Sequence, residues 1–302
     1  MLQRCCSSMA ALHGAAAAVD SIRGVAAESM TLSGREITEL LTRHGVAPSR
    51  ALGQNFLADP NTVRRIVRLA DIDRSSNVVE IGPGVGSLTT ELAATGAHVV
   101  AVELDRHLLP ILAETVEPLG VEVVHGDALE LDWVSLLPAD REWQLIANLP
   151  YNVATTIVLE LLDTVPQITK MLVMVQREVG ERLAASAGGS AYGIPSVKLS
   201  LWATASVAAR IPATVFIPQP RVESVMVRIE RRSAPIVDVD HVALMDLVRT
   251  AFGQRRKMLR RSLAEKVTPE QFVLAGIDPA DRPERLDVVQ WGALTAAVLS
   301  GK

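Results

Sequence analysis

Three glycines at alternate positions form the first candidate site. Gly82, Gly84 and Gly86 follow directly after an apolar run that predicts a buried strand over Asn77–Ile81. Glycine lets the backbone turn sharply and lets a ligand approach main-chain atoms that a Cβ would cover. Dinucleotide-binding enzymes use the spacing G-x-G-x-x-G, whereas this loop reads G-x-G-x-G with Pro83 inside it. The loop alone is also compatible with a packing turn in any α/β fold.

Two carboxylates follow the glycine loop at positions that suit an adenosine-containing ligand. Glu103 ends the next predicted strand, about 20 residues after the loop, where a carboxylate can accept hydrogen bonds from both ribose hydroxyls. Asp127 follows the third predicted strand, where it could accept a hydrogen bond from an adenine amine or cap the next helix. The sequence has no G-x-x-x-x-G-K-[ST] motif for a nucleoside triphosphate. The pattern therefore favours an adenosine-containing cofactor.

A second candidate site, Asn148-Leu149-Pro150-Tyr151, comes at the end of the fourth predicted strand. The exocyclic amine of adenine is a poor nucleophile because its lone pair is delocalised into the ring, so its alkylation requires the nitrogen to be held in line with the leaving group. The Asn148 amide oxygen and the Leu149 carbonyl could accept the two amine hydrogens, and Tyr151 could stack on the base. No strong general base is required, since the proton can leave after the transfer. The same residues could also simply make a loop turn.

Alternating strand and helix patterns between residues 60 and 233 would position both sites. Near-continuous Val and Ile runs predict an α/β fold with a doubly wound, mostly parallel sheet that binds ligands at the carboxyl ends of its strands. The predicted strands are 77–81, 98–103, 121–124, 144–147, 170–175, 206–211 and 222–229, of which the last two form an antiparallel finish. The predicted helices among them are 60–69, 88–94, 106–115, 155–162, 178–184 and 194–203.

The two ends of the chain differ from this central part. After residue 233 only helical patterns remain, at 242–252, 255–265, 269–275 and 288–299, which predicts a domain boundary near residue 234. Residues 1–29 are Ala-rich and are expected to be a flexible extension, with an export signal or an over-extended gene start as alternatives. The only cysteines, Cys5 and Cys6, are adjacent, which provides neither a disulfide framework nor a spaced set of zinc ligands. We therefore expect a reducing compartment and no metal.

Charge is unevenly distributed along the chain. The 302 residues carry a formal net charge of −4, yet residues 249–261 contain six Lys or Arg and no acid. That segment is compatible with a solvated helix face or with a nucleic-acid surface. Arg64, Arg65 and Arg68 form a second basic patch on one predicted helix. After residue 30 there is no run of about 18 uncharged apolar residues, so no membrane-spanning helix is expected.

A series of motifs in one order resembles the ribosomal RNA adenine dimethyltransferase family over roughly residues 35–265. The motifs are Leu52-Gly53-Gln54-Asn55-Phe56-Leu57, Glu80-Ile81-Gly82-Pro83-Gly84-Val85-Gly86, Glu103-Leu104-Asp105, Gly126-Asp127-Ala128, Asn148-Leu149-Pro150-Tyr151-Asn152, Gln176-Arg177-Glu178-Val179-Gly180-Glu181-Arg182, Phe216-Ile217-Pro218-Gln219-Pro220-Arg221-Val222-Glu223-Ser224 and Phe252-Gly253-Gln254-Arg255-Arg256-Lys257. The resemblance implies a Rossmann-like class I methyltransferase domain over residues 30–233 and a small all-helical RNA-binding domain over residues 234–302.

The same resemblance implies S-adenosylmethionine as the cofactor. The expected reaction places two methyl groups on each of two adjacent adenosines in a hairpin loop near the 3′ end of small-subunit (16S) ribosomal RNA. The expected partner is the immature small ribosomal subunit. We expect a cytoplasmic protein, and a monomer because the RNA supplies the large partner surface.

Residue roles also follow from the resemblance. The implied cofactor contacts are Asn55, Leu57, Gly82, Gly84, Glu103, Asp127 and Asn148, with the segment around Gln54 resembling a lid. Phe216 is implied to sandwich a flipped adenine opposite Tyr151, although it could instead plug the end of the sheet. The implied RNA-phosphate contacts are Arg221, Arg255, Arg256, Lys257, Arg260 and Arg261, with Arg228, Arg231 and Arg232 beside them.

Two other functions share part of this pattern. The large-subunit rRNA adenine methyltransferases that confer macrolide resistance share the cofactor and the Asn-x-Pro-aromatic motif. The Asn-Val-Ala-Thr continuation after Tyr151, the Phe-Gly-Gln-Arg-Arg-Lys segment and the helical tail favour the small-subunit type. A protein that only binds RNA during ribosome assembly, or a transcription factor derived from this fold, is the other alternative. The complete catalytic motifs favour an enzyme.

Overall fold

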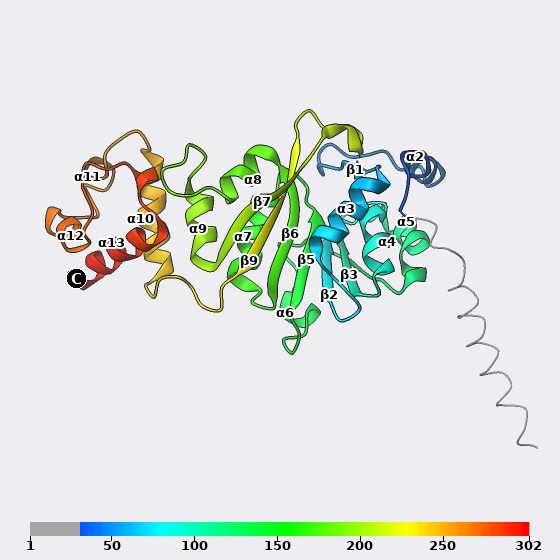
Figure 1. The fold of residues 1–302 in the computed structure, drawn as a ribbon, viewed down its shortest axis with the longest axis horizontal. Helices are drawn as coiled ribbons and strands as arrows, with labels where there is room; N and C mark the ends of the chain where they lie inside the picture. The colour runs from blue at the N-terminus through cyan, green and yellow to red at the C-terminus, as the bar shows by residue number, and fades with distance from the viewer. Residues whose placement is uncertain (1–30, 302) are drawn as a thin grey trace, which may run out of the picture.

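Runs of Val and Ile form the centre of a seven-stranded sheet, which has helices on both faces (Figure 1). The computed structural model describes residues 31–301, so the predicted extension over residues 1–29 lies outside the described residues. The sheet strands are β2 (Asn77–Ile81), β3 (His98–Glu103), β4 (Glu122–His125), β5 (Trp143–Asn148), β6 (Ile168–Gln176), β7 (Ala203–Ile211) and β9 (Ser224–Arg231). Two short strands, β1 (Phe56–Leu57) and β8 (Phe216–Ile217), pair with each other.

Some of the helices begin at local signals that the sequence contains, whereas others have no side-chain cap. Those before β7 are α2 (Gly34–Arg43), α3 (Pro60–Ala70), α4 (Ser87–Ala94), α5 (Leu109–Thr115), α6 (Trp133–Leu136), α7 (Ala154–Thr164), α8 (Arg177–Leu183) and α9 (Ile194–Trp202). Those after β9 are α10 (His241–Gly253), α11 (Leu259–Ser262), α12 (Pro269–Leu274) and α13 (Val288–Ser300), and 3-10 turns occur at η1 (Glu117–Leu119), η2 (Ala213–Val215) and η3 (Pro283–Arg285). At the start of α3, Asp59 accepts a 2.9 Å hydrogen bond from the Thr62 N–H and Pro60 is the first helical residue, as predicted.

The strand order across the sheet is β4-β3-β2-β5-β6-β9-β7. The first five of these strands run parallel, whereas β9 and β7 are antiparallel to their neighbours. The doubly wound, mostly parallel sheet with an antiparallel finish is therefore confirmed. The order reverses between β2 and β5, which is where sheets of this kind form a crevice at the carboxyl ends of their strands.

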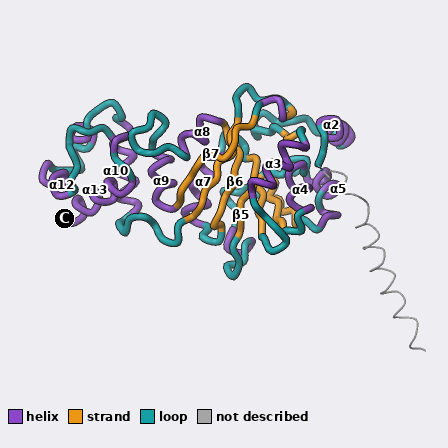
Figure 2. Tube along the Cα trace, in the orientation of Figure 1, coloured by secondary structure: helices purple, strands orange, loops and turns teal. Residues whose placement is uncertain are grey.

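Neighbouring residues of one strand pack into opposite layers of the core, between the sheet and its helices. Figure 2 shows the strands with helices on both sides of them. Val78 of β2 packs in the same layer as Ile66 of α3 and Leu92 of α4. Val79 packs in the other layer, together with Leu161 of α7. Because both faces are covered, Val78 and Val79 are both apolar and buried, which explains the continuous rather than alternating hydrophobic pattern, and Glu80 is a buried polar exception in this strand.

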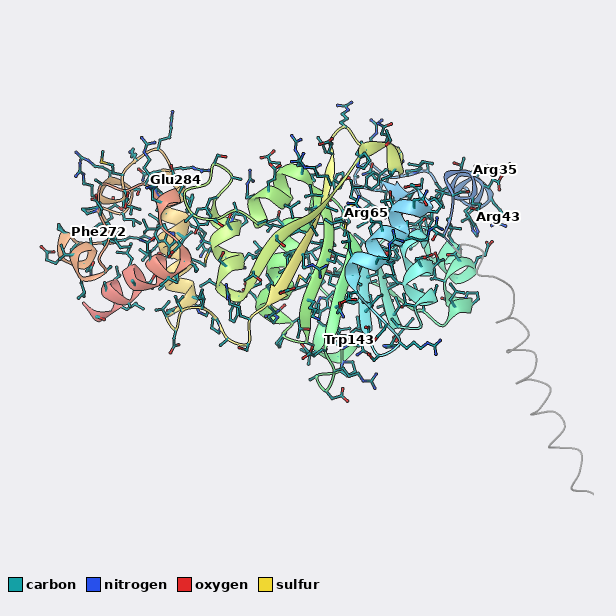
Figure 3. The ribbon with its side chains drawn as sticks, in the orientation of Figure 1. Arg35, Arg43, Arg65, Trp143, Phe272 and Glu284 are labelled. Atoms are coloured by element: carbon teal, nitrogen blue, oxygen red, sulfur yellow. The ribbon has the colours of Figure 1, made fainter. Side chains whose placement is uncertain are left out.

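The C-terminal helices form a core of their own around Phe272 and Trp291 (Figure 3 labels Phe272). Helix α9 contributes to two cores at once. Leu199 packs in the sheet core, whereas Val197 and Leu201 pack with the C-terminal helices. The predicted boundary near residue 234 lies between β9 and α10, but α9 already joins the two parts ahead of it.

The helix predicted over residues 255–265 is wrong in extent. Helix α10 ends at Gly253, residues 254–257 form a turn, and only Leu259–Ser262 are helical. The Lys257 N–H closes this turn by donating to the Gln254 carbonyl at 2.7 Å. Helix α10 ends at Gly253 because glycine favours the end of a helix. The apolar spacing suggested a longer second helix, but that spacing belongs only to the buried side chains that follow the turn. Strand β7 also begins at Ala203 rather than at residue 206, with a bulge between Val207 and Ala209.

Within residues 31–301, no helix is both long enough and apolar enough to cross a membrane.

Candidate active site

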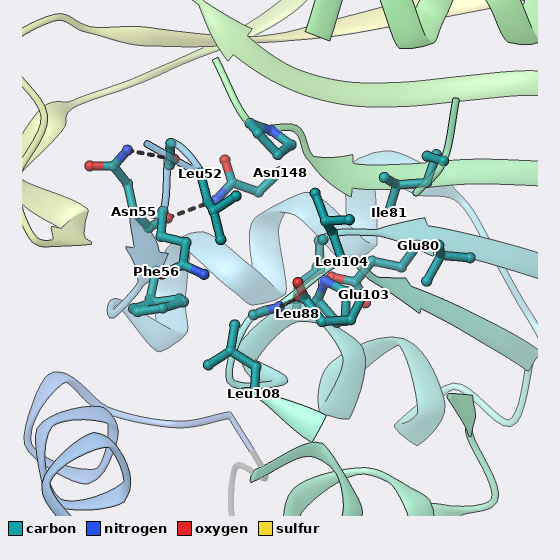
Figure 4. Close-up of a pocket in the computed structure, with 18 of the residues that line it drawn as sticks. Leu52, Asn55, Phe56, Glu80, Ile81, Leu88, Glu103, Leu104, Leu108 and Asn148 are labelled. Carbon is teal, nitrogen blue, oxygen red and sulfur yellow. Dashed lines mark hydrogen bonds between the residues drawn. The ribbon is translucent and has the colours of Figure 1, made fainter. Parts of the chain in front are cut away.

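A pocket lies at the carboxyl ends of the strands, where the sheet order reverses. Strands β2 and β5 pair only as far as Val79 and Leu145, and beyond that point their ends separate. The pocket wall comes from five parts of the chain: residues 52–57, the glycine loop, the end of β3, residues 126–128 after β4 and the end of β5. Figure 4 shows a part of this wall. Residues far apart in the sequence thus meet at the predicted ligand position.

The glycine loop has the backbone conformation that its residue types predict. Gly82, Gly84 and Gly86 have φ angles of +72°, +64° and +91°, a region that side chains with a Cβ rarely adopt. A Cβ built on Gly84 would lie 2.8 Å from the Phe56 ring, so the ring also needs a glycine beneath it. Gly82 and Gly84 both line the pocket, as expected for cofactor-binding residues.

Glu103 is held in the pocket by backbone donors. It is buried, and its Oε2 accepts a 3.1 Å hydrogen bond from the Gly84 N–H while its Oε1 accepts a 2.8 Å bond from the Asp105 N–H. Burial raises the pKa of Glu103, and these two N–H donors act in the opposite direction. Each carboxylate oxygen has a second lone pair, so the group can still accept ribose hydroxyls.

The side-chain cap of the next helix, α6, is Asp132, so the helix-capping function considered for Asp127 is wrong and the ligand-binding function remains for Asp127. Its side chain lines the pocket, and its Oδ1 accepts a 2.9 Å hydrogen bond from the Leu129 N–H in the turn that follows β4. Asn55 and Leu57 also line the pocket. The predicted cofactor residues are therefore brought together around one cavity.

Glu80 is a pocket residue that sequence reasoning did not assign. It is 1% exposed, and its Oε2 has no hydrogen-bond partner within residues 31–301. Burial raises the pKa of Glu80 to about 8, the Thr89 hydroxyl lowers it, and the Glu103 carboxylate raises it further. A buried carboxylate without a partner fits a ligand that brings a positive charge. The available signal was an acidic residue inside the apolar run that precedes Gly82.

The orientation of the Asn148 amide is set by a distant part of the chain. Its Nδ2 donates a 2.9 Å hydrogen bond to the backbone carbonyl of Asn55 (Figure 4). Since the nitrogen is the donor in this contact, Oδ1 is the atom left to accept a hydrogen from a ligand. Asn148 lines the pocket at the end of β5. This orientation is compatible with the amine-accepting function of Asn148, which stays a prediction.

The residues after Asn148 turn away from the cavity to different degrees. Pro150 lines the pocket, whereas Leu149 is buried and donates its N–H to the Met174 carbonyl at 3.1 Å. Tyr151 is partly exposed, and its hydroxyl lies 2.6 Å from Ser224 Oγ. Burial raises the pKa of Tyr151, while the bond to Ser224 acts to lower it.

Phe216 lies in the apolar core in this structure. It is 2% exposed, pairs in register with Leu57 across β1 and β8, and packs in the same cluster as Ile211. This position agrees with the alternative considered for Phe216, in which the ring plugs the end of the sheet. Its stacking on a base opposite Tyr151 stays a prediction.

Most of the predicted RNA-binding residues are exposed. The exposed ones are Arg221, between β8 and β9, and Arg256, Lys257, Arg260 and Arg261, at the turn and helix after α10. Arg255 is partly buried and donates from Nη2 to the Ser190 carbonyl at 3.0 Å. Arg65 and Arg68 of the second basic patch are exposed on α3, where Figure 3 labels Arg65, and Arg64 is partly buried.

Two arginines expected beside this surface have structural roles instead. The Arg231 guanidinium donates to the carbonyls of Leu161, Leu162, Val165 and Ile168 and so satisfies the end of α7. Arg228 donates to the Leu69 carbonyl near the end of α3. The sequence does not reveal these structural roles, because the carbonyls belong to helix ends that are distant in the chain, and contact of the two arginines with RNA stays a prediction.

Known proteins share both the sequence and the fold. Residues 48–296 match the family model described as Ribosomal RNA adenine dimethylase. The chain is 43% identical over 278 residues to the ribosomal RNA small subunit methyltransferase A of Kineococcus radiotolerans, covering 89% of this chain and 92% of that protein. It is 41% identical over 277 residues to the protein of the same name from Acidothermus cellulolyticus, covering 88% and 94%.

Solved structures give a consistent result. The chain is similar to the 23S rRNA methyltransferase ErmE, with a TM-score of 0.64, 25% identity and coverage of 81% of this chain and 99% of that one. It shares its fold with a dimethyladenosine transferase from Plasmodium falciparum, with a TM-score of 0.66, 22% identity and coverage of 79% and 95%. Given the pocket geometry and these matches, the chain belongs to the ribosomal RNA adenine dimethylase family.

Proposed function

We propose that this protein uses S-adenosylmethionine to dimethylate the exocyclic amines of two adjacent adenosines in the 3′-terminal hairpin loop of small-subunit ribosomal RNA. Family membership supports this proposal. The observation that carries it is the Asn148 amide, which is turned so that its oxygen can accept an amine hydrogen beside the pocket. The substrate is the immature small ribosomal subunit in the cytoplasm, and the protein acts on it as a monomer.

The pocket residues fit the cofactor. When bound, S-adenosylmethionine supplies a methyl group on a positively charged sulfonium. Glu103 accepts hydrogen bonds from the ribose hydroxyls with the lone pairs that Gly84 and Asp105 leave available. Asp127 accepts a hydrogen bond from the adenine amine of the cofactor. The unpaired, buried carboxylate of Glu80 provides the negative charge that a cationic ligand requires.

The clamp for the target amine comes from the end of β5. Asn148 Oδ1 and the Leu149 carbonyl each accept one amine hydrogen, which holds the nitrogen in position and favours a tetrahedral geometry. After the first transfer only one hydrogen remains on the amine, so one of these two acceptors then carries the positioning. Tyr151 stacks on the flipped base, and Phe216 completes the sandwich when its ring leaves the cluster shared with Leu57.

The basic residues bind the RNA backbone. Arg221 lies in the loop between β8 and β9, and the exposed cations at residues 256–261, named here the basic turn, lie in the C-terminal helical domain. Lys and Arg at such positions neutralise phosphates and set the register of the RNA without reading its sequence.

Transfer of labelled methyl groups tests this function. Wild-type protein should transfer label from S-adenosylmethionine to small-subunit particles that lack the modification, and the RNA should then contain dimethyladenosine. Asn148→Ala should reduce the rate by about a hundredfold or more, the usual effect of removing a positioned hydrogen-bonding group from an active site. Label in large subunits only would instead support a resistance-type activity, which the structural likeness to ErmE makes the second candidate. Absence of label in both would support an RNA-binding function alone.

A further inference from the structure

One segment of the chain contacts both the cofactor side and the target side of the pocket. This lid segment (residues 49–57) is folded back on itself by Gln54, whose Oε1 accepts a 2.7 Å hydrogen bond from the Ser49 N–H. The same side chain donates from Nε2 to Oδ2 of Asp105 at 2.8 Å. A single amide group therefore both closes the turn of the lid segment and fastens it to the loop after β3.

The hydrogen bond from Gln54 to Asp105 connects the lid segment to Glu103, the carboxylate proposed to bind the cofactor. Asp105 donates its backbone N–H to Glu103 Oε1, and Glu103 Oε2 accepts from the Gly84 N–H. The Phe56 ring of the lid segment lies over Gly84, at the position that a Cβ on that glycine would occupy. The lid segment is thus in contact with the residues that are proposed to hold the ribose.

The other edge of the lid segment holds the amine clamp. The Asn55 carbonyl accepts the Asn148 amide hydrogen, and the Ala51 carbonyl accepts a 3.4 Å hydrogen bond from Asn152 Nδ2. The two donors lie at the end of β5 and in the loop that follows it. If the Asn55 carbonyl moves, Nδ2 of Asn148 loses its fixed acceptor, and nothing then distinguishes the two ends of that amide.

We propose that the lid segment couples cofactor binding to the orientation of the amine clamp, and that Gln54 is the positioning residue that fastens the lid segment for this purpose. The inference rests on the proposed function. A cofactor held by Glu103 and Gly84 orders the lid segment through Gln54 and Phe56, and the ordered Asn55 carbonyl then fixes the Asn148 amide. The target amine consequently meets a formed clamp only when the cofactor site is filled, which is a coupling between two sites.

Reversing the polarity of one hydrogen bond isolates this role. Gln54→Glu places a carboxylate opposite the Asp105 carboxylate, so two acceptors face each other. Asp105→Asn places an amide N–H opposite Nε2 of Gln54, so two donors face each other. The new amide has this orientation because Oδ1 of residue 105 also accepts the His107 N–H. The double substitution Gln54→Glu with Asp105→Asn restores one donor and one acceptor and leaves the net charge unchanged. The carboxylate at position 54 of the double variant can also still accept the hydrogen bond from the Ser49 N–H. The double variant is therefore a matched control for charge and for folding.

Hydrogen exchange with S-adenosylhomocysteine as the probe reads the coupling without turnover. In the wild type and the double variant, the probe should protect residues 80–86 and also residues 148–153. In each single variant, protection should remain at residues 80–86 and be lost at residues 148–153. At saturating S-adenosylmethionine, kcat on small-subunit particles should fall by about tenfold in the single variants and recover in the double variant, consistent with ordinary coupling energies.

Different results would overturn different claims. Protection of residues 148–153 that survives in both single variants contradicts the coupling, as does a single variant that raises KM for the cofactor while leaving kcat unchanged. Protection at residues 80–86 alone in the wild type also contradicts the coupling but leaves the proposed function intact. Absence of any protection in the wild type contradicts the proposed cofactor, and the coupling fails with it.

Discussion

The hydroxyl of Tyr151 lies 2.6 Å from Oγ of Ser224, the first residue of β9, so the proposed stacking ring is tied to the antiparallel part of the sheet. Tyr151→Phe keeps the ring and should lower kcat/KM by only about two- to tenfold, the value of one neutral hydrogen bond. Tyr151→Ala also removes the stacking, which is worth about 1–3 kcal/mol per base, so kcat/KM should fall by about a further five- to 150-fold. Methyl transfer to small-subunit particles measures both. Equal losses in the two variants would contradict a stacking role.

Glu80 predicts that cofactor affinity depends on pH. Its pKa of about 8 keeps the carboxyl protonated near neutral pH, and a cationic ligand favours the ionised form, so binding releases a proton. Affinity for S-adenosylmethionine, which carries the sulfonium charge, should therefore rise with pH by up to about tenfold per unit and level off above about pH 8. Calorimetry across this range measures the dependence. Glu80→Gln should remove the slope, and a slope that persists in this variant would assign the proton to another group.

The same carboxyl predicts how stability without ligand changes with pH. The folded protein binds the Glu80 proton more tightly than the unfolded chain, because the pKa is about 8 in the fold against 4.5 without it. The contribution of Glu80 to stability is thus fully present below about pH 4.5 and is lost as the pH rises through about 8. Thermal unfolding of the wild type and Glu80→Gln should diverge across this window. Parallel curves would contradict the raised pKa.

Gly84 predicts an effect that combines backbone strain with a steric clash. Alanine at this position would adopt φ of +64° and place its Cβ 2.8 Å from the Phe56 ring, which would push the lid segment away from the glycine loop. Gly120 is a matched control, because its φ is +82° but a Cβ added there would have no atom within 4 Å. Both Gly84→Ala and Gly120→Ala should lose about 1–2 kcal/mol of stability from the strain. Only Gly84→Ala should weaken S-adenosylhomocysteine binding. Unchanged binding in this variant would contradict a contribution of the contact between Phe56 and Gly84 to cofactor binding.

The basic turn predicts a salt effect on RNA binding. Arg256→Ala and Lys257→Ala each remove one exposed cation, so each should weaken particle binding and reduce the slope of log K against log salt concentration by about one. Arg141→Ala is the control, because Arg141 is exposed just before the amino end of β5, at the opposite edge of the sheet from the pocket. Equal slopes for all three variants would contradict RNA binding at the basic turn.

Features that depend on local pattern could be predicted from the sequence. The strand that leads into Gly82, the position of Glu103 and the site at Asn148 all follow from hydrophobic runs and from the rule that parallel strands present their carboxyl ends together. The short α11 could not be predicted, because the spacing of buried Leu259 and Leu263 is helical while the chain before it turns at residues 254–257. Hydrophobic period does not report where a helix stops.

Features that depend on long-range contacts could not be predicted. The bond from Asn148 to the Asn55 carbonyl joins residues 93 positions apart, and no spacing rule relates them. The same is true of Arg231, because its four carbonyl acceptors lie 63 to 70 positions earlier in the sequence. The role of Glu80 could not be predicted for a related reason, since the absence of a partner for its Oε2 within residues 31–301 is visible only once the surrounding side chains are in place.

Helix α9 has a consequence for the choice of RNA. Because Leu199 packs in the sheet core while Val197 and Leu201 pack with the C-terminal helices, neither core can rotate without disrupting the other. The shared helix therefore restricts how far the basic turn can move relative to the pocket. Under the proposed function, this restriction favours an RNA whose bound phosphates and loop adenosines are separated by a matching distance, so the fold would select RNA by shape at positions where it reads no bases.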